Sequence, residues 1–397
     1  MRTFNVASDE EIKRGETTDL YFVRTKKILK AKKMDAVRVV AEVTTNGLPD
    51  KWPWGVLCGI DELLKLFEGH SVDLYTMQEG TIFCHHDYYG NKVPVAFIDG
   101  PYGEFCDLET PLLGLICHAS GVATVAARLR RLAEDKLLIS FGIRRAHPAL
   151  SPMIDRAGYL GGFDGVSSLA GARKIGKEPY GTMPHALIVM FGNQVKAWKA
   201  FDQVMPRKVR RIALVDTYYD EKAESIMAVE ALGKKLWGVR LDTPGSRKGN
   251  FPEIVREVRW EMDIRGHKHV KIIVSGGVND NNIVELVDAG VDGFGIGTAL
   301  SNAPTIDFAL DITELKRQPV AKRGKIGGRK QVWRCSRCLT DVVLPGGARG
   351  PKCPACGGKT SALLIRVMKK GRITIREPEV DQIRKRVMAQ LKKFTVV

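Results

Sequence analysis

Short apolar runs alternate with helical patterns between about residues 137 and 300. The helical stretches, such as 220–235 and 250–266, have glycine at or near their C-terminal ends. This alternation is typical of repeated strand–helix units that build a parallel sheet. Seven such units favour a barrel, and an open doubly wound sheet is the competing topology. The predicted strands cover residues 137–141, 164–169, 187–191, 212–216, 238–242, 272–276 and 293–297.

The segments on either side of this region have different patterns. The first 115 residues mix strand and helix patterns, including 35–43 and 59–69, and are expected to form a separate α/β domain. After residue 302 the chain has a strand-like run over 362–371 and a charged helical pattern over 381–394. The sequence therefore predicts an α/β protein with an N-terminal domain (1–115), an irregular (β/α) barrel (116–301) and a C-terminal region (302–397).

No segment is expected to span a membrane or to direct export. The first fifteen residues carry charges where a signal peptide has an apolar core. The most apolar window, 110–127, is interrupted by His118, Ser120 and Thr124. We therefore expect a cytoplasmic protein without a membrane partner.

Four of the eight cysteines have the spacing of a metal site. Two Cys-x2-Cys pairs, separated by fourteen residues, are typical of two hairpins that close on one tetrahedral zinc ion. A site with four thiolates is closed, so the zinc is expected to be structural, although iron can occupy such a site. Two disulfides are disfavoured because no export signal is present. The predicted ligands are Cys335, Cys338, Cys353 and Cys356, within a knuckle over 335–356.

The formal net charge of +17 is concentrated near the C-terminus. From Lys316 onward there are 22 Lys and Arg against 4 Asp and Glu, whereas the first 315 residues hold 40 against 41. The body is thus near neutrality, which disfavours a nucleic-acid surface over it, whereas the basic tail can still carry an anion site.

Glycine turns follow the last two predicted strands. Residues 275–277 read SGG, and residues 295–298 read GIGT. In a barrel, the ends of the last two strands often bind phosphate through backbone amides at the start of a helix. Together the two turns indicate a phosphate site, although either alone is weak evidence.

Charged and polar side chains gather at other strand ends. Arg240 and Asp242 share one face of a strand because alternate residues point the same way. They form either an internal salt bridge or a site in which Asp242 meets sugar hydroxyls or hydrated magnesium and Arg240 meets a phosphate. Thr182 and His185 lie in a loop bounded by Gly and Pro, just before a predicted strand.

Seven motifs in order along the chain resemble those of nicotinate phosphoribosyltransferases, in particular the archaeal form with a zinc knuckle. They are TDLYF (18–22), FGIRRAHP (141–148), GTMPHA (181–186), RLDTPGSRKGN (240–250), SGG (275–277), FGIGT (294–298) and the four-cysteine knuckle. The resemblance implies a head-to-tail homodimer or higher homo-oligomer whose barrel sites are completed by a neighbouring subunit. It also implies that nicotinate and phosphoribosyl pyrophosphate give nicotinate mononucleotide and pyrophosphate, with ATP hydrolysis and magnesium.

The resemblance implies a role for each matching residue. Phe141 would stack on the pyridine ring, with Tyr21 of the partner subunit on its other face. Thr182 would line the nicotinate pocket, and Arg144 would contact the carboxylate or a phosphate. His185 matches the histidine that ATP phosphorylates. Arg240 and Asp242 would hold the phosphoribosyl group, with Gly276, Gly277, Gly297 and Thr298 on its phosphate.

Some neighbouring residues receive weaker assignments. Some relatives have two small hydroxyl residues after the proline at 244, whereas here only Ser246 supplies a hydroxyl. Arg145 is expected to point away from the site, and His147 has no assigned role. The tail residues Lys322, Arg323 and Lys325 are candidates to contact pyrophosphate or ATP across the dimer.

Three alternatives stay open. Quinolinate has two carboxylates and would need more cations around the base than the sequence places there, and nicotinamide lacks the anion that Arg144 would meet. A zinc-knuckle nucleic-acid-binding protein is the alternative of another class. It leaves the residues at the strand ends unexplained, and the tail lacks an aromatic stacking run.

Overall fold

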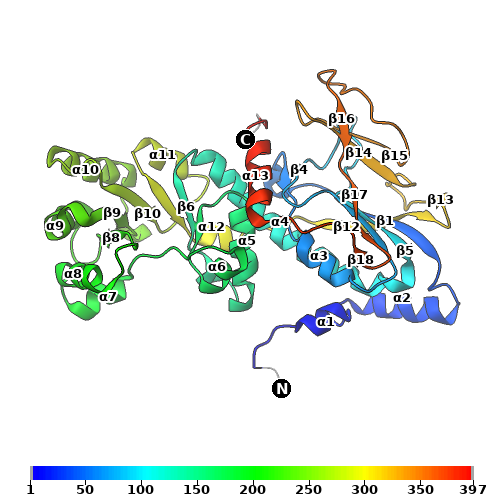
Figure 1. Cartoon of the computed structure of the whole chain (residues 1–397), viewed down its shortest axis with the longest axis horizontal. Helices are drawn as coiled ribbons and strands as arrows, with labels where there is room; N and C mark the ends of the chain where they lie inside the picture. The colour runs from blue at the N-terminus through cyan, green and yellow to red at the C-terminus, as the bar shows by residue number, and fades with distance from the viewer. Residues whose placement is uncertain (1–2, 395–397) are drawn as a thin grey trace. The chain divides into compact units, whose positions relative to one another are not determined.

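The computed structural model describes residues 3–394 (Figure 1). Within this range the chain divides into two compact units. Unit 1 combines the residues up to Thr124 with those from Ala303 onward, and unit 2 is Val125–Asn302. The three domains expected from the sequence, with boundaries after residues 115 and 301, stay a prediction.

Unit 1 is built on a seven-stranded antiparallel sheet with the order β13-β12-β1-β5-β3-β17-β18. Strand β1 lies inside this sheet, and seven of its eight residues are buried, which explains why it reads as an apolar run. Two smaller sheets accompany it, β15-β14-β16 and β2-β4. The strands are β1 (Arg38–Thr45), β2 (Gly55–Val56), β3 (Asp73–Thr76), β4 (Ile82–Phe83), β5 (Ala96–Pro101), β12 (Phe308–Leu315), β13 (Gln318–Pro319), β14 (Lys330–Cys335), β15 (Asp341–Pro345), β16 (Thr360–Ala362), β17 (Ile365–Lys369) and β18 (Arg372–Ile373).

The helices of unit 1 differ in how they are stabilised and in how much of their surface is buried. Ser8 and Glu11 form a capping box at the start of α1 (Asp9–Lys13). Helix α3 (Ile60–Phe67) buries its apolar face, and α13 (Val380–Leu391) buries Ile383 and Val387. Helix α2 (Leu20–Ala31) is mostly exposed. The helices expected over 59–69 and 381–394 and the strand expected over 362–371 are confirmed within one to a few residues.

Helix α4 (Glu109–Leu132) contains the most apolar window of the chain. The helical stretch Cys106–Leu132 could cross a membrane by length and composition, but 61% of its apolar window is buried inside the protein. The hydroxyl of Ser120 donates to the carbonyl of Cys58, and the hydroxyl of Thr124 accepts from the Val56 N–H at 2.8 Å. These contacts are those of a core helix in a packed protein.

Unit 2 contains a six-stranded parallel sheet with the order β7-β6-β11-β10-β9-β8. The first strand of unit 2 along the chain, β6, pairs with the last strand of unit 2, β11, so the sheet curls into a half-barrel that is open between β7 and β8. This confirms the α/β class and the irregular barrel. The strands are β6 (Leu137–Ser140), β7 (Gly165–Val166), β8 (Arg211–Leu214), β9 (Leu236–Leu241), β10 (Lys271–Ser275) and β11 (Gly293–Ile296).

The strand predicted over 187–191 is wrong, because these residues belong to helix α7 (His185–Phe191). Pro184 is the extended N-cap of this helix, and Gly192 ends it in the left-handed conformation. The segment lies between β7 and β8, so the barrel is open where the seventh strand was expected.

The remaining helices of unit 2 connect the strands, and α7 to α11 contact one another in chain order (Figure 1). They are α5 (Ser151–Leu160), α6 (Leu169–Ile175), α8 (Gln194–Val204), α9 (Glu221–Leu232), α10 (Phe251–Ile264), α11 (Ile283–Asp288) and the single turn α12 (Thr298–Ser301).

Candidate active site

A cavity of about 610 Å³ lies at the carboxyl ends of the strands of unit 2. Parallel α/β sheets place their ligand sites at this edge. Most of the side chains and glycines predicted from the sequence line it, although they come from several strand ends and from the segment that leads into α7. They are Phe141, Arg144, Thr182, His185, Arg240, Asp242, Gly276, Gly277, Gly297 and Thr298.

Two predicted substrate-binding residues lie outside the wall of this cavity. Tyr21 belongs to α2 in unit 1, and 59% of it is exposed. Ser246 is exposed in a short 3-10 turn, Gly245–Arg247. The assignment of Tyr21 to a partner's site stays a prediction.

Arg240 is the centre of the hydrogen-bond network in the wall. Its Nε donates to Ser275 Oγ at 2.9 Å, and its Nη1 donates to Thr182 Oγ1 at 2.8 Å. Its Nη2 lies 2.8 Å from Asp242 Oδ2, and Ser275 Oγ donates to Asp242 Oδ1 at 2.7 Å. The guanidinium is 14% exposed, and its Cζ lies 5.4 Å from the centre of the Phe141 ring. Arg240 and Asp242 therefore form the internal salt bridge that is one of the two interpretations of their spacing in the sequence.

The position of the Phe141 ring depends on Gly295. A Cβ atom at residue 295 would lie 2.3 Å from Phe141 Cδ2 and 2.4 Å from Cε2, well inside van der Waals contact. The first glycine of the GIGT turn therefore leaves room for an aromatic ring from the neighbouring strand, whereas the sequence indicated only a phosphate site for this turn.

His185 is the first residue of α7 and lies between two carboxylates. Its Nδ1 is 3.1 Å from Thr217 Oγ1, and its Nε2 is 3.7 Å from both Asp216 Oδ1 and Asp242 Oδ2. The Asp216 side chain is only 3% exposed. Burial raises the pKa of Asp216 to about 6, and the nearby imidazole opposes this shift.

A buried carboxylate fixes the loop that carries Thr217. Glu224, on α9, accepts hydrogen bonds from the backbone N–H groups of Thr217, Tyr218 and Tyr219, at 3.2, 2.7 and 2.9 Å. Glu224 lies in the first turn of α9, so this helix fixes the loop in which Thr217 contacts His185.

Sequence reasoning missed several residues of the wall. Ser167 and Met183 line the cavity, and so does Arg145, contrary to the expectation that it points away. His147 is not part of the wall, and its Nδ1 accepts from the Ala149 N–H at 3.2 Å as a cap. The proximity of Asp216 to His185 had no sequence signal beyond its place at the end of a strand.

The four cysteines of the predicted knuckle meet in unit 1. Their Sγ atoms all lie within 4.8 Å of one another, and the separations from Cys335 to Cys356 and from Cys338 to Cys353 are both 3.5 Å. These separations are too long for disulfides, which require about 2.05 Å. The cluster can bind a metal ion such as zinc with four thiolates.

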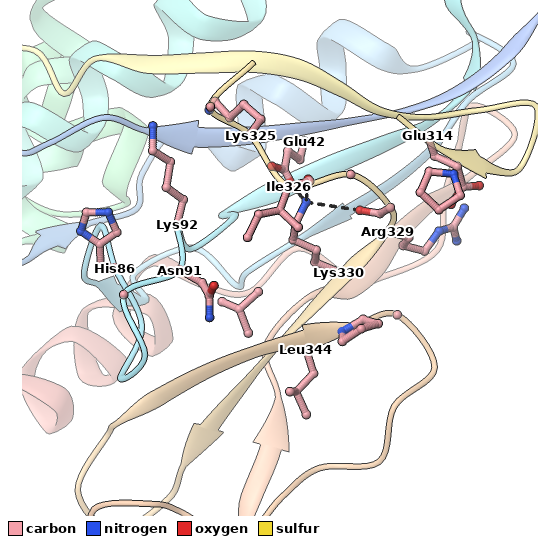
Figure 2. Close-up of a pocket in the computed structure, with 18 residues that line it drawn as sticks. Glu42, His86, Asn91, Lys92, Glu314, Lys325, Ile326, Arg329, Lys330 and Leu344 are labelled. Atoms are coloured by element: carbon pink, nitrogen blue, oxygen red, sulfur yellow. Dashed lines mark hydrogen bonds and ion pairs between the residues drawn. The ribbon is translucent and has the colours of Figure 1, made fainter. Parts of the chain in front are cut away.

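A second cavity, of about 640 Å³, lies in unit 1 (Figure 2). Three lysines and an arginine line this cavity. The two buried lysines, Lys325 and Lys330, are each paired with a carboxylate. Lys330 Nζ donates to Glu42 Oε2 at 2.7 Å, and Lys325 Nζ lies 2.6 Å from Asp311 Oδ2. Lys322 also pairs with Asp311, at 2.5 Å. Although burial raises it, hydrogen bonds from the two lysines hold the pKa of Asp311 below its usual value.

The comparisons with known proteins agree with this architecture. The family models described as quinolinate phosphoribosyl transferase match residues 19–120 with the N-terminal domain and residues 122–311 with the C-terminal domain. A structure described as nicotinate-nucleotide pyrophosphorylase from Pyrococcus furiosus is 51% identical, with a TM-score of 0.96 over 100% of both chains. Human nicotinic acid phosphoribosyltransferase shares the fold, with a TM-score of 0.75 at 20% identity over 95% of this chain and 93% of that one.

A nicotinate phosphoribosyltransferase of Mycobacterium tuberculosis, pncB1, is 32% identical over 349 residues. The match covers 78% of this chain and 76% of that relative. The similarity therefore extends over both units rather than over a single motif. This chain belongs to the nicotinate phosphoribosyltransferase family.

Proposed function

We propose that this protein forms nicotinate mononucleotide and pyrophosphate from nicotinate and phosphoribosyl pyrophosphate, with ATP hydrolysis, in the salvage of NAD. The proposal rests on a single cavity whose wall combines an aromatic ring, an arginine, a carboxylate paired with a second arginine, and two glycine turns. Nicotinate offers a flat ring with one carboxylate, and phosphoribosyl pyrophosphate offers a sugar with phosphates at both ends. Each chemical feature of the two substrates has a partner of suitable type in the wall.

The base would be held by residues that follow β6 and by the loop before α7. Phe141 stacks on the pyridine ring, Thr182 lines its pocket, and Arg144 pairs with the carboxylate. Tyr21 of the partner subunit covers the other face of the ring. The exposed apolar residues Leu20, Tyr21 and Ile28 on α2 support an intersubunit role in a homodimer or higher homo-oligomer.

The phosphoribosyl group would be held by the ends of β9, β10 and β11. Asp242 accepts hydrogen bonds from the sugar hydroxyls or from water on a magnesium ion, which supplies positive charge to the departing pyrophosphate. The turns at Gly276-Gly277 and Gly297-Thr298 bind the 5-phosphate, with Ser246 as a further donor. Arg240 holds Asp242, Ser275 and Thr182 in register.

Displacement at the anomeric carbon passes through an oxocarbenium-like sugar, so the enzyme gains most by orienting the two anions in line. The ring nitrogen is already a nucleophile and requires no strong general base. The residues of this chain therefore act by binding, alignment and charge, and the small-molecule site fits a cytoplasmic enzyme.

The activity is tested by measuring product formation from phosphoribosyl pyrophosphate with nicotinate, nicotinamide or quinolinate, with and without ATP. We expect turnover of nicotinate and stimulation by ATP. If nicotinate is not turned over, the proposal is wrong. Tight, salt-dependent RNA binding without turnover would support the nucleic-acid alternative instead.

Quinolinate is the second candidate substrate, and one observation favours it. Arg145 lines the cavity together with Arg144, so a second cation is available for a second carboxylate. The matching family models are also described as quinolinate phosphoribosyl transferase. Release of carbon dioxide from quinolinate in the same assay would select this candidate.

The phosphohistidine is tested by His185→Ala. Loss of the imidazole removes the acceptor of the ATP phosphoryl group, so we expect ATP stimulation to disappear while phosphoribosyl transfer without ATP persists. Acid-labile phosphate incorporated from labelled ATP measures the modification directly. ATP stimulation that survives unchanged in this variant would show that His185 has another role.

A further inference from the structure

The turn that follows β10 has an unusual backbone. Gly276 and Gly277 have φ values of +79° and +73°, a conformation that side-chain-bearing residues rarely adopt. Both glycines are exposed and line the cavity of unit 2. Two successive residues in this region can present their amides on one side as a concave anion site.

Three side chains bind the carbonyl groups of this turn. Lys248 Nζ donates to Gly276 O. Asn282 Nδ2 donates to Gly277 O at 2.9 Å, and Asn279 Nδ2 lies 3.4 Å from the same oxygen. Asn282 Oδ1 also accepts from the Asn279 N–H at 3.0 Å. Among the described residues, the wall of the cavity includes none of these three.

The direction of the carbonyls determines the direction of the amides. In a trans peptide the C=O and the following N–H point in opposite directions. The Gly277 N–H therefore points away from Lys248, and the Val278 N–H points away from Asn282. Among residues 3–394, neither amide has a hydrogen-bond acceptor, so both are free to bind a ligand.

We propose that Lys248 and Asn282 are positioning residues that hold the Gly276-Gly277 turn with its amides toward a phosphate group. The proposal rests on the proposed function, in which this phosphate is the 5-phosphate of phosphoribosyl pyrophosphate. Lys248 comes from the loop after β9, which also carries Asp242, so it links the phosphate turn to the sugar-binding carboxylate. Asn282 is the residue that precedes α11, so it links the turn to that helix.

The test uses the full chain and two probes, ribose 5-phosphate and nicotinate, whose dissociation constants are measured by calorimetry. Lys248→Met and Asn282→Ala are each expected to weaken ribose 5-phosphate binding about five- to tenfold, the effect of about one intramolecular hydrogen bond. The KM for phosphoribosyl pyrophosphate should rise in parallel. The affinity for nicotinate and kcat at saturation should change by less than about twofold, because the base site is untouched.

Further variants separate positioning from general effects. Asn282→Asp keeps the acceptor for the Asn279 N–H but loses the donor to Gly277 O, so it should weaken ribose 5-phosphate as the alanine variant does. Lys248→Arg keeps a donor and should recover part of the affinity. The matched controls are Arg247→Met and Asn281→Ala, exposed neighbours that are expected to bind as the unmodified chain does.

Equal ribose 5-phosphate affinity in the unmodified chain, Lys248→Met and Asn282→Asp would overturn the proposal. So would an equal loss in Arg247→Met, because the effect would then be one of net charge. If the unmodified chain turns over nicotinate normally, either result counts against the positioning role alone. A chain that neither binds ribose 5-phosphate nor forms nucleotide would refute the proposed function and the positioning role together.

Discussion

Arg240→Met is expected to lower kcat/KM about 10²- to 10³-fold, because it removes the half-buried ion pair that positions Asp242, and a misplacement of about 1 Å in a catalytic site can cost about 10²-fold. The substitution removes the guanidinium donors to Asp242 Oδ2 and to Ser275 Oγ, and it removes the cation that lies beside the Phe141 ring. The methionine keeps most of the side-chain volume, so the loss of kcat/KM can be attributed to the missing guanidinium. Steady-state kinetics with both substrates measure the effect, and thermal unfolding checks that the variant is folded.

The matched control for this variant is Arg210→Met. Arg210 is exposed just before β8, and its guanidinium stacks on Trp237 at 4.3 Å, outside the cavity wall. The control is expected to retain its kcat/KM. A similar kinetic loss in both variants, or no loss in Arg240→Met, would contradict the central position assigned to Arg240.

Cys335→Ser is expected to lower the metal content of the protein and to destabilise unit 1. The thiol is buried at the end of β14, in a three-stranded sheet whose strands are three to six residues long. Structural zinc contributes on the order of 10–16 kcal/mol to the folding of small zinc fingers, so a loss of about 5 kcal/mol is a conservative expectation. Metal analysis and thermal unfolding with and without a chelator measure both effects.

Cys84→Ser is the control for the cysteine cluster. Cys84 is half-buried in unit 1 and is not part of the cluster. This variant should keep its metal and its chelator sensitivity. A Cys335→Ser protein with one equivalent of metal and unchanged melting would show that the four thiolates do not form a structural metal site.

Much of the fold could be predicted because strands that are buried on both faces read as apolar runs. Six of the seven runs in the barrel region are strands. The remaining run, 187–191, belongs to helix α7, in which only Ile188 is buried. A run of five apolar residues fits either structure, and the proline and the glycine that bound it are compatible with both.

The site was predictable to the extent that its residues follow strand ends. Phe141, Asp242 and the glycine turns could be placed in this way, because parallel strands bring their carboxyl ends to one edge. The direction of a side chain beyond the strand could not be predicted, as Arg145 shows. The network around Arg240 joins residues 58 and 35 positions apart in the chain, and no local pattern carries such contacts.

The two-segment construction of unit 1 has a consequence for the order in which the chain can fold during synthesis. Strand β1 pairs with β12, so Val39 lies opposite Leu315. At about 5–20 residues per second, a ribosome needs roughly 14–55 s to advance the 276 positions from one to the other. Throughout this interval one edge of β1, a strand that is buried in the finished fold, has no partner, although all six strands of unit 2 are made before the interval ends. A nascent chain arrested near residue 302 would thus present an aggregation-prone edge, which makes translation speed through the central region a determinant of the yield of folded protein.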